Sequence, residues 1–149
     1  MIDVVNKQRK WKVDAGNWKN FATRALLAIK GTETSAVLVF VSDREMRRLN
    51  REFRGKEGTT DVLSFPGSSG ESGFFPQECP GEVVISMPRA AAQAGQNGLT
   101  LTEEISQLVL HGLLHLSGYD HETDNGAMDA LEIRLRRKLG VEGRPSSAR

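Results

Sequence analysis

The chain has 149 residues, of which 26% are charged and 38% hydrophobic, and its formal net charge is +1. These values fit one globular domain with a hydrophobic core, and they exclude a disordered or fibrous protein. Cys79 is the single cysteine, so an internal disulfide is excluded and a reducing compartment is expected. No apolar stretch approaches the ~20 residues that a membrane span needs, and the N-terminus lacks the features of a signal peptide. We therefore expect a cytoplasmic protein with no membrane partner.

The first half of the chain alternates strands and helices. Residues 2–5 are short and β-branched, which predicts a strand, and apolar residues at helical spacing predict a helix from about residue 17 that ends at Gly31. Residues 36–41 form a continuous apolar run, which is typical of a strand covered on both faces. Residues 42–45 have a capping-box pattern, so a second helix is expected to begin there. The buried stripe predicted for this helix consists of Met46, Leu49 and Phe53.

Two strands and a long loop follow. Residues 62–65 predict a strand that stops at Pro66, where a hydrogen-bond donor of the ladder would be lost. Residues 67–80 are rich in Gly, Ser and Pro and predict an exposed loop, and residues 81–86 predict a fourth strand. The third and fourth strands are expected to pair antiparallel.

The last third of the chain is predicted to be helical. Pro88 suits the first turn of a helix over residues 88–94, which Gly95 is expected to break. Residues 100–103 form a second capping box, so a helix should begin near residue 102, and its nearly all-round apolar character predicts a central, buried position. Asp124 is expected to cap a final helix. The buried stripe of that helix is predicted to consist of Met128, Leu131, Leu135 and Leu139. The basic residues near its end suit the helix dipole, and they are Arg134, Arg136, Arg137 and Lys138.

Together these elements predict four strands and about five helices. The alternation at the start of the chain implies parallel pairing, and the later strand is expected to add an antiparallel member. We therefore predict the α+β class, with a small mixed four-stranded sheet packed by helices. Residues 1–140 are predicted to form one domain, and residues 141–149 a disordered tail.

All three histidines of the chain lie within eleven residues. His111 and His115 are four residues apart in the central predicted helix, which places both imidazoles on one face. Gly118 can end the helix and turn the chain, so that His121 approaches the same point. Three imidazoles with a fourth position left to water are the arrangement of a catalytic zinc, so we predict one Zn²⁺ per chain on these histidines. Asp120 is the nearest candidate to orient an imidazole, although it could equally bond the backbone of its own turn.

The spacing of these histidines is that of a long zinc-protease motif, with one difference. The residue after the first histidine is Gly112, where those proteases carry the glutamate that acts as general base. Three neutral imidazoles leave zinc with its full double positive charge, which can acidify bound water to a pKa near ~7 or polarise an anionic oxygen. This chemistry favours a negatively charged substrate, such as a phosphodiester, over a peptide.

A cluster of basic residues lies on and just after the second predicted helix. Its members are Arg44, Arg47, Arg48, Arg51, Arg54 and Lys56. Acidic residues are interspersed among them, so one interpretation is a solvated helix face. The other is a phosphate-binding surface, because arginine forks match phosphate oxygens. On the second interpretation the substrate-binding residues are Arg47, Arg48, Arg51 and Arg54.

The segment from residue 111 to 121, HGLLHLSGYDH, resembles the H-G-x-L-H-L-x-G-Y-D-H signature of the bacterial YbeY family. The resemblance also covers residues 49–50, 60–66 and 81–85 and the region of Arg54, in the family's order. It implies a small zincin-like α+β domain with a central metal-bearing helix. It also implies that the three histidines are zinc ligands and, with Arg54, catalytic residues. Glu82 stands where the family usually has aspartate, and the loop over residues 67–80 looks longer than usual.

What the resemblance implies for function is a zinc-dependent endoribonuclease that is specific for single strands. Such an enzyme acts in 16S rRNA 3′-end maturation and 70S ribosome quality control, with ribosomal RNA and ribosomal particles as its partners, and we assume a monomer. Two alternatives stay open. One is a ribosome-assembly factor that binds RNA through its arginines while zinc supports the structure. The other is a metallopeptidase, against which the missing glutamate at position 112 argues.

Overall fold

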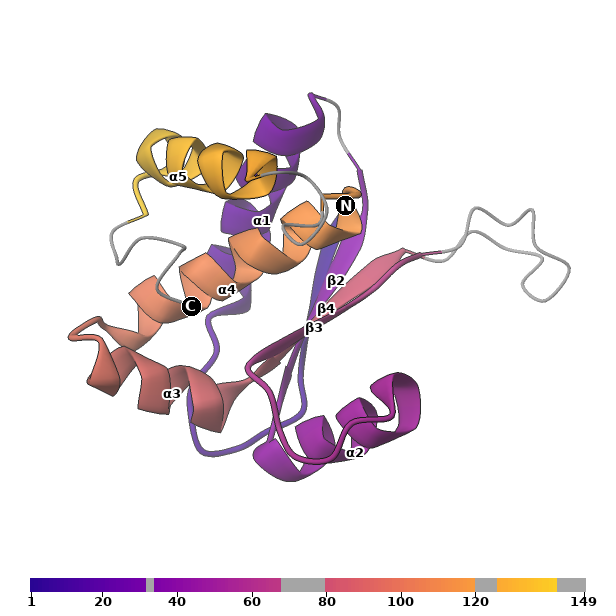
Figure 1. Ribbon diagram of the computed structural model, residues 1–149. Coiled ribbons are helices and arrows are strands. Elements are labelled where there is room, and N and C mark those ends of the chain that lie inside the picture. The colour runs from indigo at the N-terminus through magenta and orange to yellow at the C-terminus, as the bar shows by residue number, and fades with distance from the viewer. Residues whose placement is uncertain (32–33, 68–79, 120–125, 142–149) are drawn as a thin grey trace, which may run out of the picture.

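The computed structural model describes residues 1–31, 34–67, 80–119 and 126–141, and these form four strands and five helices (Figure 1). In chain order the elements are β1 (Ile2–Asn6), α1 (Ala15–Lys30), β2 (Ala36–Val41), α2 (Asp43–Arg54), β3 (Val62–Phe65), β4 (Gly81–Ser86), α3 (Met87–Gln96), α4 (Leu101–Leu116) and α5 (Ala127–Leu139). The predicted α+β class is confirmed. All four predicted strands are present. Turn or capping residues bound each apolar run, so the sequence marks where each strand ends.

The strands form one mixed sheet in the order β1-β2-β4-β3. β1 with β2 and β2 with β4 pair in parallel, whereas β3 and β4 pair antiparallel, as predicted. The prediction that the first three strands continue one parallel order is wrong. β3 is the antiparallel edge strand, and β4 lies beside β2. β4 suits this central position because Val83, Val84 and Ile85 are all buried, as expected for a strand with both faces covered.

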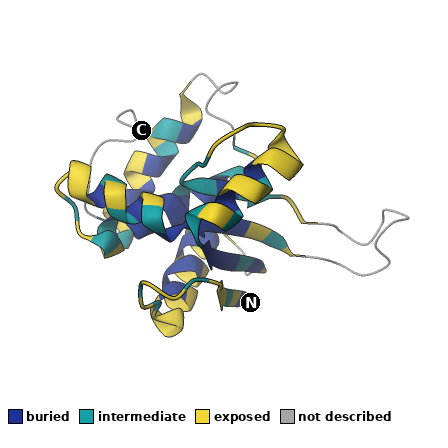
Figure 2. Cartoon of the chain, turned by 90° about the horizontal axis from the view of Figure 1, so that it is seen from below, coloured by how far each residue is buried: buried dark blue, intermediate teal, exposed yellow. Residues whose placement is uncertain are grey.

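Helices cover both faces of the sheet. α1, α3, α4 and α5 lie on one side and α2 lies on the other (Figure 1). Successive residues of a strand point to opposite faces, so Leu38 and Phe40 of β2 join the larger core, while Val39 and Val41 pack with Met46 of α2. In Figure 2 the buried residues gather in the middle of the molecule and the exposed ones lie on the outer sides of the helices.

The most buried helix is α4. It begins with the predicted capping box: the hydroxyl of Thr100 accepts a hydrogen bond from the backbone N–H of Glu103 at 3.1 Å, and the carboxylate of Glu103 accepts one from the N–H of Thr100 at 2.8 Å. Contacts with α1, α3, α5, β3 and β4 cover nearly all of its sides. Glu104 lies two helical turns before His111 and is fully buried, so it is not the surface charge that its place near the helix start suggests.

Two predicted features of α2 and α3 need correction. Phe53 is 64% exposed, and it packs edge-on against Phe65 with the ring centroids 5.5 Å apart. The buried position near the end of α2 belongs to Asn50, whose side-chain amide donates a hydrogen bond to the carbonyl of Gly58 at 3.1 Å. Gly95 does not break α3, because the helix continues to Gln96. The free-energy cost of a single glycine in a last helical turn is smaller than the stabilisation that the whole helix gains from packing.

The final helix also differs at its start. α5 begins after Gly126, which is its N-cap and makes no side-chain hydrogen bond there. The predicted cap, Asp124, lies outside the described residues. Met128 and Leu135 of the predicted stripe are buried, and Leu131 and Leu139 are half-buried against the same core. Arg136 lies in the last turn of the helix, as predicted, but its side chain is buried and pairs with Glu132, so the helix dipole is not its whole explanation.

In the described part of the chain, no helix combines the length and apolar character needed to cross a membrane. The domain boundaries, residues 1–140 and a tail over 141–149, stay a prediction, since residues 142–149 lie outside the described ranges. The same holds for the structure of the loop predicted over residues 67–80, of which residues 68–79 are not described.

Candidate metal centre

α4 brings His111 and His115 together on one face. Their Nε2 atoms lie 3.2 Å apart, and the ring centroids are separated by 4.7 Å with the ring planes at 76°. Both residues are half-buried, and the side chain of His111 is 18% exposed. The four-residue spacing therefore has the consequence expected from the sequence, and both imidazoles can be reached from outside the core.

The separation of these two nitrogens fits a shared metal ion. Zinc binds imidazole nitrogen at about 2.0–2.1 Å, and two such ligands at tetrahedral corners lie about 3.3–3.4 Å apart. The observed distance of 3.2 Å between the two Nε2 atoms is close to that edge. The pair could therefore hold two corners of a zinc tetrahedron without moving their helix.

The third predicted ligand, His121, and the predicted orienting residue, Asp120, lie outside the described residues. Their roles stay predictions. Within residues 1–31, 34–67, 80–119 and 126–141, no group of three His, Cys, Asp or Glu side chains is placed to hold a metal ion. The described chain does show the end of the helix that precedes them: Ser117 is the C-cap of α4, and Gly118 has a φ of 98°, in the left-handed region that glycine favours.

The two histidines open onto a cavity of about 370 Å³. Its walls come from the end of α2, from β3 with its flanking residues, and from the last turns of α4. The lining residues are Arg54, Asp61, Val62, Ser64, Pro66, His111, His115 and Leu116. Arg54 is the last residue of α2, which ends at Gly55 in a left-handed conformation with a φ of 65°. Folding thus brings the guanidinium of Arg54, from a distant part of the sequence, into the same cavity as the two histidines.

Asp61 and Ser64 belong to this cavity but were not singled out from the sequence. Asp61 is half-buried and is the one carboxylate among the described lining residues. The hydroxyl of Ser64 donates a hydrogen bond to the carbonyl of Gly112 at 3.0 Å, which ties β3 to α4 beside the histidines. Their placement depends on the antiparallel edge position of β3, so spacing along the chain gave no signal for it.

Gly112 packs tightly against the sheet. A Cβ atom at this position would lie 2.5 Å from Cγ1 of Val83 and 3.3 Å from the hydroxyl oxygen of Ser64. Carbon atoms in contact normally stay about 3.5–4.0 Å apart. A side chain where zinc proteases carry their catalytic glutamate would therefore force Val83 to shift, so the packing disfavours that base, which is also absent from the sequence.

A buried acidic residue contacts the first histidine from the opposite side. Oε1 of Glu132, on α5, lies 2.8 Å from Nδ1 of His111, and Oε2 of Glu132 accepts a hydrogen bond from Arg136 at 2.8 Å. Sequence reasoning missed both residues. A signal existed, because Glu132 lies four residues after Met128 and three before Leu135, on the apolar stripe of the helix. A charged residue on such a stripe needs a partner in the folded protein.

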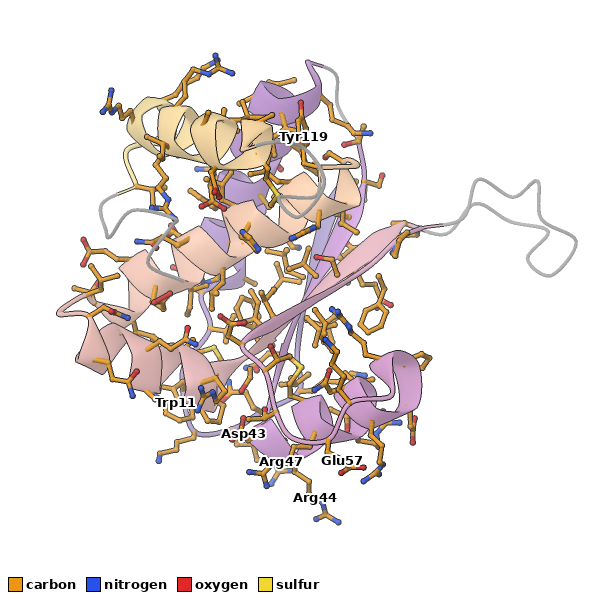
Figure 3. All side chains as sticks on the ribbon, viewed as in Figure 1. Trp11, Asp43, Arg44, Arg47, Glu57 and Tyr119 are labelled. Atoms are coloured by element: carbon orange, nitrogen blue, oxygen red, sulfur yellow. The ribbon has the colours of Figure 1, made fainter. Side chains whose placement is uncertain are left out.

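The remaining predicted substrate-binding residues lie elsewhere. Arg47, Arg48 and Arg51 line a separate hollow of about 450 Å³ on α2. In Figure 3, Arg44 and Arg47 project from the outer side of that helix, away from α4. Arg48 pairs with Glu45, and with Glu52 at 2.7 Å. The hydrogen bond from Arg48 lowers the pKa of Glu45. The structure thus brings only Arg54 of the four predicted arginines to the histidines.

Comparisons with known proteins cover nearly the whole chain. The family model described as Endoribonuclease YbeY matches residues 3–140. The Endoribonuclease YbeY of Koribacter versatilis is 43% identical over 145 residues, which cover 97% of this chain and 88% of that protein. That of Solibacter usitatus is 52% identical over 103 residues, or 69% of this chain and 65% of that protein. The solution structure of TM1509 from Thermotoga maritima matches with a TM-score of 0.64 and 26% identity, over 93% of this chain and 89% of that one.

Fold and site together define a class of small α+β proteins in which a buried helix presents paired histidines beside a mixed sheet. Within that class, the chain belongs to the Endoribonuclease YbeY family. The resemblance found in the histidine segment is confirmed. We predicted a hydrolase that cuts RNA, and the members of this family are named endoribonucleases.

Proposed function

We propose that this protein is a zinc-dependent endoribonuclease specific for single strands. Its proposed cellular role is 16S rRNA 3′-end maturation and 70S ribosome quality control, with ribosomal RNA and ribosomal particles as partners in the cytoplasm. The observation that carries the proposal is the pair of Nε2 atoms, 3.2 Å apart, in one cavity with Arg54. Membership of the Endoribonuclease YbeY family supports RNA as the substrate.

Each group of the site has a proposed role. His111, His115 and His121 would hold one Zn²⁺, and zinc when bound supplies a positive charge that acidifies water and polarises a phosphate oxygen. Arg54 would hold the phosphate in the cavity by charge-assisted hydrogen bonds to its oxygens. The same guanidinium would stabilise the negative charge that develops on those oxygens as the phosphodiester bond breaks. Asp120 keeps its proposed role as an orienting residue.

The test begins with elemental analysis of the purified chain and cleavage of a single-stranded 16S precursor 3′ end. We expect about one zinc per chain, loss of cleavage on chelation, and recovery when zinc is added back. His115→Ala should abolish both zinc binding and cleavage. Lys19→Ala, at an exposed position of α1, is the control and should leave both unchanged. Equal cleavage by a His111→Ala/His115→Ala double variant would rule out the metal mechanism.

Strand and particle specificity need separate measurements. The same sequence should be cut as a single strand and resist cleavage when it is annealed to a complement. Ribosomal particles carrying an unprocessed 16S 3′ end, incubated with wild type and with His115→Ala, would show whether assembled RNA is a substrate. Cleavage of free RNA without cleavage in particles would contradict the ribosomal role while leaving the nuclease intact.

A second candidate function has one observation in its favour. The outer hollow with Arg47 and Arg51 is separate from the histidine cavity, so a surface that only binds RNA could exist without catalysis. The protein would then be a ribosome-assembly factor whose zinc supports the structure. Two variants separate the functions: Arg54→Ala should cut the turnover of an enzyme, whereas Arg47→Ala/Arg51→Ala should lower the RNA affinity of a binding factor.

A metallopeptidase has little structural support. The packing of Gly112 against Val83 disfavours the usual glutamate base at its place on the helix. We expect a peptide-library digest with the zinc-loaded protein to show no cleavage. Cleavage that is lost in His115→Ala would revive this function.

A further inference from the structure

A chain of three buried or half-buried polar side chains connects α5 to the candidate metal centre. Glu132 is 1% exposed, and its two carboxylate oxygens contact different partners: Oε1 lies 2.8 Å from Nδ1 of His111, and Oε2 lies 2.8 Å from Nη2 of Arg136. Arg136 is itself 6% exposed. A buried carboxylate between an arginine and an imidazole is costly to desolvate unless both contacts are made. The burial of Glu132 therefore depends on its contacts with both His111 and Arg136.

We propose that Glu132 and Arg136 are positioning residues that hold His111 in the tautomer protonated on Nδ1. The proposal rests on the proposed metal site, since it concerns the ring nitrogen that would face the metal. An ionised carboxylate only accepts hydrogen bonds, so the hydrogen in the 2.8 Å contact belongs to Nδ1 of His111. A neutral imidazole protonated on Nδ1 keeps its lone pair on Nε2.

That lone pair has the direction that a metal ligand needs. Nε2 of His111 is the atom that lies 3.2 Å from Nε2 of His115, on the cavity side of the ring. The opposite tautomer would place a hydrogen at the centre of the site and would block one of its corners. Glu132 thus selects the tautomer by its contact on the far side of the ring, and it does not itself line the cavity.

Arg136 completes the arrangement by holding Glu132 in place. Its guanidinium donates to Oε2, while Oε1 contacts the histidine. The two residues are one helical turn apart, so α5 presents both as a single preformed unit. The neighbouring Arg137 is exposed on the same helix, which makes it a matched control.

The decisive measurement is made on the metal-free protein. Nitrogen-15 NMR of the histidine side chains, recorded where the rings are neutral, distinguishes protonation on Nδ1 from protonation on Nε2. We expect His111 of the wild type to be protonated on Nδ1, and Glu132→Ala to shift it toward the Nε2-protonated form. Glu132→Gln keeps an accepting oxygen and should largely restore the wild-type tautomer, while Arg137→Gln should change nothing.

Zinc competition with a chromophoric chelator supplies the second readout. Loss of a carboxylate that orients a metal-bound histidine lowers metal affinity by about 10–100-fold. We expect this loss for Glu132→Ala, a smaller one for Glu132→Gln and for Arg136→Gln, and none for Arg137→Gln. If Glu132→Ala does not fold, the tautomer of the wild type and of Glu132→Gln still decides the matter.

Two results would overturn the proposal. One is a wild-type His111 protonated on Nε2 in the metal-free protein, and the other is a folded Glu132→Ala variant with an unchanged tautomer. Failure of the proposed function is distinguishable from both. In that case the wild type binds no zinc and cuts no RNA, whatever tautomer His111 adopts.

Discussion

Replacing Gly112 by alanine should destabilise the protein even though the position lies inside a helix. Alanine is favoured over glycine in a helix interior by about 1 kcal/mol. The new Cβ would lie 2.5 and 3.1 Å from the two Cγ atoms of Val83, which is fully buried in β4 and stiff at χ1. Overpacking costs about 1–3 kcal/mol, and contacts this short belong to the upper end. The expected net loss in unfolding free energy is therefore about 2 kcal/mol.

Urea denaturation of a double-mutant cycle tests this reasoning. Val83→Ala alone removes buried methyl groups and should cost on the order of 2 kcal/mol. In the Gly112→Ala/Val83→Ala protein the new Cβ enters the vacated space. The loss of unfolding free energy in this double variant should therefore be smaller than the sum of the two single losses by about 2–3 kcal/mol.

Gly95→Ala is the control, because it makes the same substitution in α3, where the new Cβ would meet no side chain or other element of the described fold within 4 Å. It should leave stability equal or raise it by up to about 1 kcal/mol. A Gly112→Ala protein as stable as the wild type, or strict additivity in the cycle, would refute the close approach of α4 to β4.

Three further predictions concern other parts of the chain. Thr100→Ala removes the capping box of α4 and should lower the unfolding free energy by about 1 kcal/mol, measured by thermal or urea unfolding. If Arg51 contacts a phosphate, Arg51→Ala should reduce the slope of log RNA affinity against log salt by about one unit, whereas an unchanged slope assigns it to the solvated face. The pKa of Glu45 is lowered by Arg48, so its ionised form stabilises the fold above the ordinary carboxyl pKa and loses that effect as pH falls through the lowered value. The difference in urea midpoint between wild type and Glu45→Gln should therefore narrow from pH 7 to pH 3, and a constant difference would contradict the pairing.

Local signals along the chain predicted the elements well. Side-chain caps at Ser42 and Thr100 satisfy backbone N–H groups through residues three positions away, so a pattern in the sequence suffices to place those helix starts. Strand pairing was harder, because the position of β4 between β2 and β3 depends on contacts between distant segments. Phe53 was wrongly predicted to be buried for the same reason. Helical periodicity tells which face of α2 points to the sheet, but the extent of the sheet decides how many residues of that face are buried.

For the candidate site, the sequence by itself determined that His111 and His115 share a face, since a four-residue separation on a helix leaves no other geometry. It also determined the family, because the histidine segment is specific. Only the tertiary structure decided what surrounds the imidazoles. Helix packing brings Glu132 behind His111, and the end of α2 brings Arg54 in front of it. These neighbours come from segments far apart in the chain, and their meeting depends on how helices pack on the sheet, which no local spacing encodes.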